Sequence, residues 1–368
     1  MLRSIAVALV QPFTALRYDV GKAGTLAELV APPYDVIGPA ERTALRARSP
    51  YNVVHLTLPD SEREAGRLLR DWQRVGVLRR EEEPAVWALS QTYLGPDGVE
   101  RTRNGLVASL LAEPYSTGAV LPHERTHRAP REGRLRLLRE VRAQLEPIFL
   151  LYDGEPPFAG PERQPELEAE GTRLWRMPMA AVGEAFADRQ LLIADGHHRY
   201  ETAVAFGEEQ GTPESASLLA VLVSTSDPGL MIFPTHRVFR TVPAGVPLEL
   251  VDSRVDDPEH ALRRLEALPR DTPAVAVYRD GKTYLAVAAG SELDVDFVDR
   301  LGHEGISYTP DWREAVRSVD SGEAAVALLM RPTRIEDVFA VARGGSVMPQ
   351  KSTYFYPKLL TGLLLHPL

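Results

Sequence analysis

The most informative segment of the sequence is residues 191–203, which read LLIADGHHRYETA. Its first four residues are apolar and predict a short strand, the glycine predicts a tight turn, and the residues after it have the spacing of an amphipathic helix. In such a turn, backbone N–H groups and the positive end of a helix dipole meet at one point, where an anion is favoured. The segment therefore predicts an anion-binding site where a strand passes into a helix.

Polar side chains surround the glycine of this turn. His197, His198 and Arg199 add hydrogen-bond donors next to Gly196. Asp195 is a candidate ligand for a magnesium ion whose other ligands are waters and phosphate oxygens. The alternative is an ordinary turn in which Asp195 caps the helix and both histidines are solvated. So many polar groups at one strand end exceed what a turn requires, and we therefore favour the functional interpretation.

The neighbouring sequence alternates between strand-like and helix-like stretches. Short runs rich in β-branched and aromatic residues predict strands at 52–58, 85–93, 105–111, 148–152, 191–194 and 218–224. Apolar residues at helical spacing predict helices at 61–75, 132–145 and 200–210. This alternation indicates an α/β or α+β fold built from layers of strands and helices.

The length of 368 residues indicates more than one domain, at roughly 100 to 200 residues for each. A connector-like stretch at 241–247 is followed by a helical pattern at 258–268 and by a hairpin pattern at 274–287 that turns at Asp280-Gly281. We therefore expect three parts in the chain. They are a first domain over residues 1–238, a smaller α/β domain over 239–345, and a C-terminal segment, 346–368, that docks on the first domain.

The composition excludes several classes of protein. With 51 acidic and 42 basic side chains, the net charge of -9 supplies no diffuse attraction to nucleic acid or to an anionic bilayer. The absence of cysteine excludes disulfides, thiolate metal sites and a cysteine nucleophile. No window approaches the roughly 18 uncharged apolar residues of a membrane-spanning helix. We expect a cytoplasmic protein with small-molecule partners, and the composition does not indicate an oligomeric state.

A second polar segment is residues 121–127, LPHERTH, which matches the H-E-x-x-H pattern of zinc peptidases. That pattern binds zinc when both histidines lie on one face of a buried helix. Here Pro122 precedes the pattern, Pro130 follows it, and arginines surround it. We expect that His123 and His127 do not share a zinc ion. We interpret the segment as a loop that contacts a polar substrate or a nucleotide, and an ordinary exposed loop is the alternative.

A third segment, residues 348–358, reads MPQKSTYFYPK and contains two of the four lysines of the chain. Apart from these four lysines, every basic side chain counted as Lys or Arg is an arginine, so two lysines within eleven residues are unusual. A compact ammonium acts as a point charge on phosphate, which favours Lys351 and the adjacent Ser352 as phosphate ligands. The alternative is an aromatic-rich tail that only packs on the first domain, and both interpretations can hold together.

Residues 31–37, APPYDVI, form a stiff turn, because each proline fixes its own φ angle and extends the residue before it. A rigid loop suits ligand contacts, and Tyr34 and Asp35 are its candidate substrate ligands. Such turns also occur without a ligand. The glycine-rich motifs of P-loop and Rossmann proteins are absent from the sequence, which argues against both of those nucleotide sites.

Four of these segments together resemble a known family. Residues 32–37, 123–126, 193–203 and 348–358 look like the motifs of the family filed as domain of unknown function 1015, in the family's order and across essentially the whole chain. The DGHHR stretch at 195–199 also resembles the phosphate-binding motif of ParB-like nucleotide-binding domains and of free-serine kinases. This resemblance implies a ParB-like or sulfiredoxin-like first domain, with a nucleotide held at a helix N-terminus.

The resulting hypothesis is a magnesium-dependent phosphotransferase that uses a nucleoside triphosphate or diphosphate on a small hydroxyl-bearing metabolite, with free serine as the candidate. Kinases of this kind use a carboxylate to orient or deprotonate the hydroxyl, and residue chemistry makes Glu124 and Asp35 the candidates for that role. A ParB-like nucleotide sensor without turnover and a phosphate-ester hydrolase are the alternatives.

The hypothesis assigns a role to each candidate residue. We expect catalytic roles for Glu124, Asp195 and His198, with Asp195 also the metal ligand. We expect phosphate or nucleotide binding by Gly196, His197, Arg199, Lys351 and Ser352. We expect substrate binding by Tyr34, Asp35 and His123.

Overall fold

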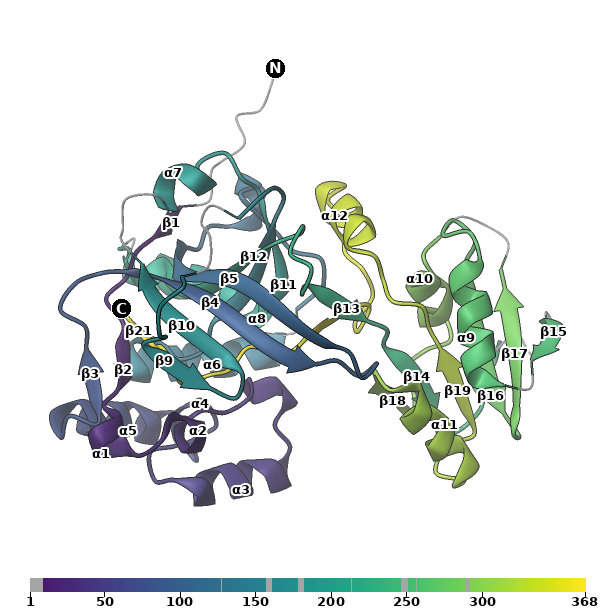
Figure 1. Cartoon of the computed structure of the whole chain (residues 1–368), viewed down its shortest axis with the longest axis horizontal. Coiled ribbons are helices and arrows are strands. Elements are labelled where there is room, and N and C mark those ends of the chain that lie inside the picture. Colours follow the sequence, from purple (N-terminus) through teal and green to yellow (C-terminus); the bar gives the residue numbers. More distant parts are fainter. Residues whose placement is uncertain are drawn as a thin grey trace. The chain divides into compact units, whose positions relative to one another are not determined.

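The computed structural model of the chain describes residues 9–126, 128–156, 161–177, 182–212, 214–245, 251–255, 257–288 and 292–368 (Figure 1), with 251–255 described by their backbone. These residues form two compact units. The first contains the described chain up to Gly95, Val99–Leu230 and Pro357–Leu368, and the second contains Pro96–Gly98 and Met231–Tyr356. The chain therefore leaves the first unit after Leu230 and returns to it at Pro357.

A mixed β-sheet forms the centre of the first unit, and it has nine strands in the described residues. In spatial order, eight strands are β6 (Val120–Leu121), β11 (Leu191–Asp195), β8 (Ile148–Tyr152), β12 (Ser217–Ser224), β5 (Glu100–Leu111), β4 (Val86–Leu94), β10 (Thr172–Met177) and β9 (Leu167–Ala169). The ninth, β1 (Val10–Gln11), pairs with β5. Strand β11 is parallel to β6 and antiparallel to β8. The ends of β6 and β11 and the beginning of β8 therefore meet at one edge of the sheet.

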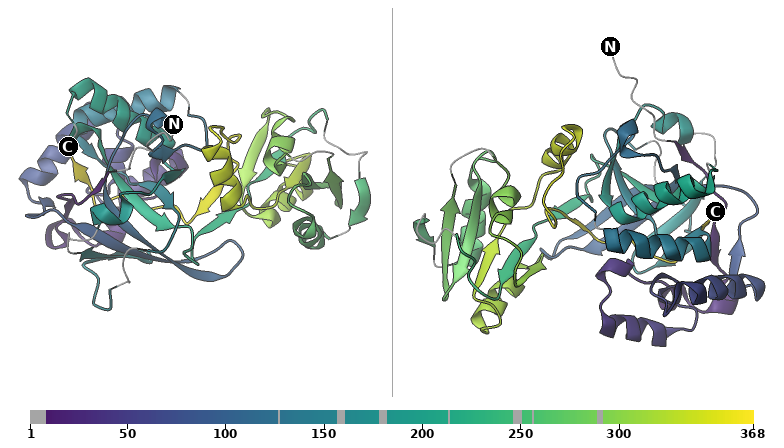
Figure 2. Two further views of the ribbon diagram at one scale, coloured as in Figure 1. Left: turned by 90° about the horizontal axis from the view of Figure 1, so that it is seen from above. Right: turned by 180° about the vertical axis from the view of Figure 1, so that it is seen from behind.

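Three helices of the first unit lie side by side. They are α5 (Glu62–Arg74), α6 (Arg128–Val141) and α8 (His197–Gln210), with α6 in contact with both of the others (Figure 2). Helix α8 also contacts β8 and β12. Its buried Tyr200 and Ala203 join Leu150, Ile193 and Leu222 of the sheet in one apolar core. This apolar core holds α8 against the sheet.

Smaller elements complete the first unit. Its short strands are β2 (Leu16–Tyr18), β3 (Leu78–Arg80), β7 (Ala143–Gln144) and β21 (His366–Pro367). Its short helices are α1 (Val20–Ala23), α2 (Leu26–Leu29), α3 (Pro39–Arg48), α4 (Val54–Thr57) and α7 (Val182–Phe186), and its 3-10 helices are η1 (Tyr34–Val36), η2 (Tyr115–Thr117) and η4 (Glu214–Ala216).

The returning C-terminal segment is built into the first unit. Leu365 exchanges backbone hydrogen bonds with Leu16, and Thr361 exchanges them with Ala31. Strand β21 pairs with β7, and Leu363, Leu364 and Leu365 are buried. Backbone pairing and apolar burial therefore hold Pro357–Leu368 at several places along its length.

The predicted elements agree with the structure for the central strands and for the helices α5 and α8. Ser61 caps α5 by accepting a hydrogen bond from the Glu64 N–H. The helix predicted at 132–145 instead spans Arg128–Val141. The strand predicted at 52–58 is wrong, because Val54–Thr57 forms a helical turn. Asn52 accepts from the Val54 N–H and donates to the Glu28 and Val30 carbonyls, which favours the helical turn over the local β propensity.

The second unit contains a six-stranded sheet in its described residues, with the order β15-β17-β16-β19-β14-β18. Its strands are β14 (His236–Phe239), β15 (Val251–Val255), β16 (Ala274–Arg279), β17 (Lys282–Val287), β18 (Ile306–Thr309) and β19 (Val326–Leu329), and a separate pair is formed by β13 (Met231–Phe233) and β20 (Tyr354–Tyr356). Its helices are α9 (Pro258–Ala267), α10 (Asp294–Asp299), α11 (Trp312–Asp320) and α12 (Ile335–Arg343).

The hairpin predicted in the second unit is confirmed. Strands β16 and β17 pair in register and are joined by Asp280 and Gly281, whose φ angles are 52° and 69°. Positive φ at both central residues is the geometry of the tight turns that match strand twist. Among the described residues of both units, no helix is long and apolar enough to cross a membrane.

Candidate functional site

The site is organised by the turn between β11 and α8. The pairing of β11 with β8 is irregular between Ile193 and Asp195, and such a bulge changes where the following side chain points. Gly196 then adopts a φ of 102°, and a Cβ atom placed there would lie 2.7 Å from the Ile148 Cγ2 atom. Only glycine fits this position. Gly196 is the N-cap of α8 and has no side chain that could accept hydrogen bonds from the first N–H groups of the helix. The positive end of the helix dipole is therefore not occupied by a capping side chain.

Asp195 lies between two cationic side chains. Its Oδ2 atom accepts a hydrogen bond from Arg199 Nη2 at 2.7 Å, and its Oδ1 atom accepts one from Lys358 Nζ at 2.5 Å. Burial alone would raise the pKa of Asp195, but the charges of Lys358 and Arg199 outweigh it and hold that pKa well below its ordinary value. The carboxylate is therefore ionised throughout the physiological pH range.

Arg199 connects this aspartate to a second acidic group. Its side chain is buried, and its Nη1 atom donates to the Pro147 carbonyl. Burial would lower the pKa of Arg199, but the nearby Asp195, Glu146 and Asp35 raise it above its ordinary value. Arg199 therefore stays charged, with carboxylates around its guanidinium.

Glu146 fixes the stiff turn predicted at 31–37. Its Oε1 atom accepts the Tyr34 N–H at 2.9 Å, and its Oε2 atom lies 3.5 Å from Arg134 Nη1. The Arg134 guanidinium in turn lies 3.9 Å from the centre of the Tyr34 ring. Burial raises the pKa of Glu146 despite the opposing charges of Arg199 and Arg134. Glu146 thus brings Tyr34 and Asp35 to the same edge of the sheet as Asp195.

Two buried histidines lie on the other side of the turn. His123 follows β6, and its Nδ1 atom donates to the Ile193 carbonyl at 2.6 Å, while its backbone N–H donates to His197 Nε2 at 3.2 Å. The two rings meet edge to face, with centroids 4.7 Å apart. Burial lowers the pKa of His123 to about 4, and burial together with His123 lowers the pKa of His197. Both imidazoles are neutral at pH 7, with His197 Nε2 as an acceptor.

The remaining predicted residues fall into two groups. Glu124 and His198 are half-buried and follow His123 and His197 directly along the chain, so they belong to the first unit and to this edge of the sheet. Lys351 and Ser352 belong to the second unit, where Ser352 donates to the Pro349 carbonyl and Lys351 has a φ of 58°. His127 lies outside the described residues. The contacts of the first unit therefore connect Asp195 with Arg199, His123 with His197, and Glu146 with the Tyr34 turn.

Sequence reasoning missed three residues at this edge: Glu146, Lys358 and Arg103. Lys358 carried a signal, because it lies in the segment 348–358 that contains half of the lysines. Glu146 and Arg103 carried none. A glutamate before a strand and an arginine within a strand are typical of exposed positions, whereas here they are 5% and 0% exposed.

The arrangement does not fit a resident magnesium ion on Asp195. Both oxygens of the carboxylate accept from cationic side chains, and a divalent cation at the same oxygens would be repelled by them. Within the described ranges, no group of three His, Asp or Glu side chains is placed to hold a metal ion.

The fold and the site define a mixed α/β protein with a charged loop at the junction of a strand and a helix, which confirms the predicted fold class. The chain belongs to the family described as "Protein of unknown function (DUF1015)", whose model matches residues 10–304. The family resemblance found in the sequence is thereby confirmed over residues 10–304, which contain three of its four motifs, whereas the motif at 348–358 lies outside the matched residues. A comparison with curated proteins found no match.

Solved structures offer weaker similarities. A free serine kinase in complex with AMP is 17% identical, with a TM-score of 0.40, over 67% of this chain and 89% of that chain. A free serine kinase mutant in complex with ADP is 15% identical, with a TM-score of 0.37 and the same coverage of 67% and 89%. A conserved hypothetical protein from Pyrococcus furiosus is 16% identical, with a TM-score of 0.37, over 67% of this chain and 92% of that chain.

Proposed function

We propose that the protein transfers a phosphoryl group from a nucleotide to the hydroxyl of a small metabolite, with free serine as the candidate substrate. One observation carries the proposal. At the N-terminus of α8, the ionised Asp195, the charged Arg199 and the neutral His197 lie at one edge of the sheet with the Tyr34-Asp35 turn. Phosphoryl transfer depends mainly on positioning and charge stabilisation, which such a set of groups supplies.

Each group has a role in this proposal. The N–H groups at the beginning of α8 and the Arg199 guanidinium bind phosphate oxygens of the nucleotide. His197 and His123 stay neutral, so His123 holds its loop against β11 without adding charge. Asp195 keeps Arg199 oriented. Magnesium arrives with the nucleotide phosphates, as part of the substrate.

The base that orients or deprotonates the hydroxyl is proposed to be Asp35 or Glu124. Asp35 follows Tyr34, whose N–H is bound by Glu146, and the charge of Asp35 raises the pKa of both Arg199 and Glu146, which supports Asp35 as a candidate. Glu124 follows the buried His123. Asp35→Asn and Glu124→Gln distinguish them, because loss of the base lowers kcat by roughly a hundredfold or more and leaves ADP binding within a few-fold.

The test is phosphorus NMR of the purified chain with ATP, magnesium chloride and L-serine. We expect a new phosphomonoester signal that grows as ATP is consumed, and we expect it to be lost in Arg199→Ala. Inorganic phosphate without an ester would instead identify a hydrolase. An unchanged spectrum, with ATP raising the unfolding temperature, would identify a nucleotide sensor and overturn the transferase proposal.

A further inference from the structure

Two side chains in the middle of the sheet hold the backbone of the returning C-terminal segment. Gln91 on β4 and Arg103 on β5 are directly opposite each other in the antiparallel register. Arg103 Nη2 donates to Gln91 Oε1 at 2.6 Å and to the Pro357 carbonyl at 2.9 Å. Gln91 Nε2 donates to the Lys358 carbonyl at 3.3 Å. Two successive carbonyls of the segment are therefore bound by one cross-strand pair.

Arg103 occupies an environment that is costly for a charge. It is 0% exposed, and burial lowers its pKa to about 10. Its guanidinium lies 4.5 Å from the centre of the Phe149 ring, and Phe149 is the β8 partner of Asp195 in the sheet. Burial of a guanidinium costs free energy unless its donors are hydrogen-bonded. The bonds from Arg103 to Gln91 and to the Pro357 carbonyl therefore also fix the position of the returning segment.

The residue placed by this pair is Lys358. Its ammonium reaches Asp195 across 163 positions of sequence and shares the carboxylate with Arg199. The side chain of Lys358 is 21% exposed, so it is not completely enclosed by the protein. Lys358 and Arg199 thus bring two cationic side chains to one carboxylate next to the N-terminus of α8, where an anion is favoured.

We infer that Lys358, rather than Lys351, supplies the ammonium of the C-terminal segment that binds the phosphates of the nucleotide, and that Gln91 and Arg103 position it. This inference rests on the proposed function. Lys358 exchanges its contact with Asp195 for a phosphate oxygen, and Asp195 keeps Arg199 as its partner. The four-carbon stem of lysine allows such a shift without movement of the backbone.

The test is isothermal titration of the full chain with ADP, AMP and inorganic phosphate as separate probes. Loss of a charge-assisted contact in Lys358→Met should weaken nucleotide binding about ten- to a hundredfold. Lys351→Met should change it less than about twofold. Lys282→Met, on the exposed face of β17, is the matched control for removal of one positive charge.

Thermal unfolding of each variant verifies that the fold is retained. If Lys358→Met does not fold, Lys358→Gln replaces it, because the amide still donates to Asp195 but carries no charge. The positioning role is tested with Gln91→Met. It should weaken binding of ADP in the presence of Lys358 and change it less than about twofold when combined with Lys358→Gln, because the two residues act on one contact.

The outcomes separate the inference from the proposed function. Wild-type protein that binds none of the three probes overturns both. Binding by wild-type protein that persists in Lys358→Met and Lys358→Gln, or that is lost in Lys351→Met instead, overturns the inference and leaves the proposed function intact. Effects of Gln91→Met and Lys358→Gln that simply add overturn the positioning role.

Discussion

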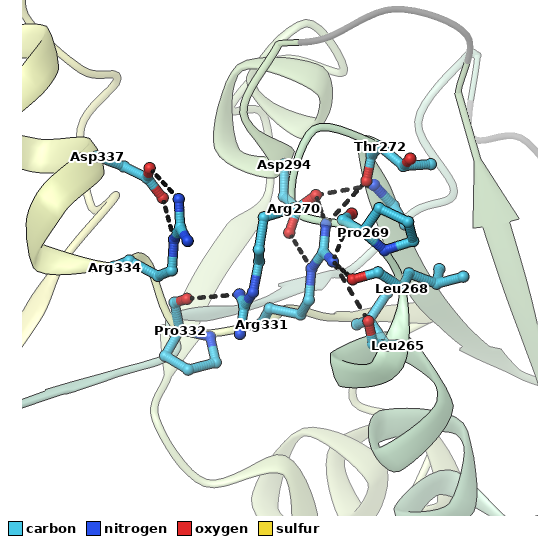
Figure 3. Close-up of polar contacts among 11 residues, drawn as sticks. Leu265, Leu268, Pro269, Arg270, Thr272, Asp294, Arg331, Pro332, Arg334 and Asp337 are labelled. Carbon is cyan, nitrogen blue, oxygen red and sulfur yellow. Dashed lines mark hydrogen bonds and ion pairs between the residues drawn. The ribbon is translucent and has the colours of Figure 1, made fainter.

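Each unit of the protein buries an arginine against an aspartate, and the two pairs are built differently. In the second unit, Arg331 binds both oxygens of Asp294 at 2.7 Å, and its remaining donors reach the carbonyls of Leu265, Leu268, Pro269 and Thr272 (Figure 3). In the first unit, Asp195 binds one donor of Arg199 and the ammonium of Lys358. The Arg331–Asp294 pair is completed by backbone carbonyls, whereas the Asp195 carboxylate is shared by two cationic side chains.

The partners of each pair indicate its role. Arg331 satisfies carbonyls at the end of α9 and in the loop after it, while Asp294 begins α10 and accepts the Ala274 N–H. The charges of Arg331 and Asp294 neutralise each other, and the Arg331 donors are occupied by Asp294 and by backbone carbonyls. This pair therefore has no donor left for a ligand, and its role is structural. The Asp195 carboxylate is instead shared by two cationic side chains, Arg199 and Lys358, at a helix N-terminus, which is the arrangement that the proposed phosphate site uses.

The two pairs should differ most in how much they contribute to the free energy of unfolding. Arg331→Met leaves a buried carboxylate and several carbonyls without their partner, so the free energy of unfolding should fall by about 3–5 kcal/mol. Urea denaturation followed by circular dichroism measures this loss. Arg334→Met is the matched control, because Arg334 is 46% exposed in its pair with Asp337 and its loss should cost less than about 1 kcal/mol. Equal losses in the two variants would contradict the structural role of Arg331.

A smaller effect is expected in ligand binding. Arg199→Lys keeps a charge beside Asp195 but cannot also reach the Pro147 carbonyl or present two parallel donors to a phosphate. The affinity for ADP should fall about tenfold, or about 1.4 kcal/mol, in isothermal titration.

The control for that variant is Arg139→Lys, which changes an exposed arginine of α6 that pairs with Glu209. It should leave the affinity for ADP unchanged. An unaltered affinity for ADP in Arg199→Lys would show that the phosphates bind elsewhere. It would also contradict the functional difference proposed between Arg199 and Arg331.

The smallest effects concern how stability depends on pH within the first unit. The pKa of Asp195 is lowered by folding, so its contribution to stability is present above its unfolded pKa of about 4 and is lost as the pH falls below that value. The pKa of Glu146 is raised by folding, so its ionisation destabilises the fold as the pH rises from about 4 through its folded pKa. The two carboxylates therefore have opposite slopes.

Thermal unfolding between about pH 2 and pH 7 checks both slopes. Relative to wild type, Asp195→Asn should lose stability as the pH rises to about 4 and should keep that deficit up to pH 7. Glu146→Gln should gain stability relative to wild type as the pH rises above about 4. A gain by Asp195→Asn at neutral pH would show that Arg199 and Lys358 do not stabilise its charge. A flat difference for Glu146→Gln would show that this carboxyl is not desolvated by folding.

Local patterns in the sequence predict much of the fold. The apolar run before Gly196, the helical spacing after it and the Asp280-Gly281 turn are short-range features, and the structure contains each of them. The strand prediction at 52–58 is wrong because long-range hydrogen bonds from Asn52 to the carbonyls of Glu28 and Val30 determine the conformation of this segment. Contacts between distant residues do not appear in local periodicity.

The turn at Asp195 and Gly196, the helix that follows it and the absence of cysteine chemistry can be read from the sequence, because each is a property of neighbouring residues or of composition. The contact of Lys358 with Asp195 and the bond from the Tyr34 N–H to Glu146 become visible in the folded chain alone. The folded chain also decides that His123 and His197 are neutral. Charge and pKa depend on burial and on partners within a few ångströms, and the folded chain brings those partners from positions far apart in the sequence.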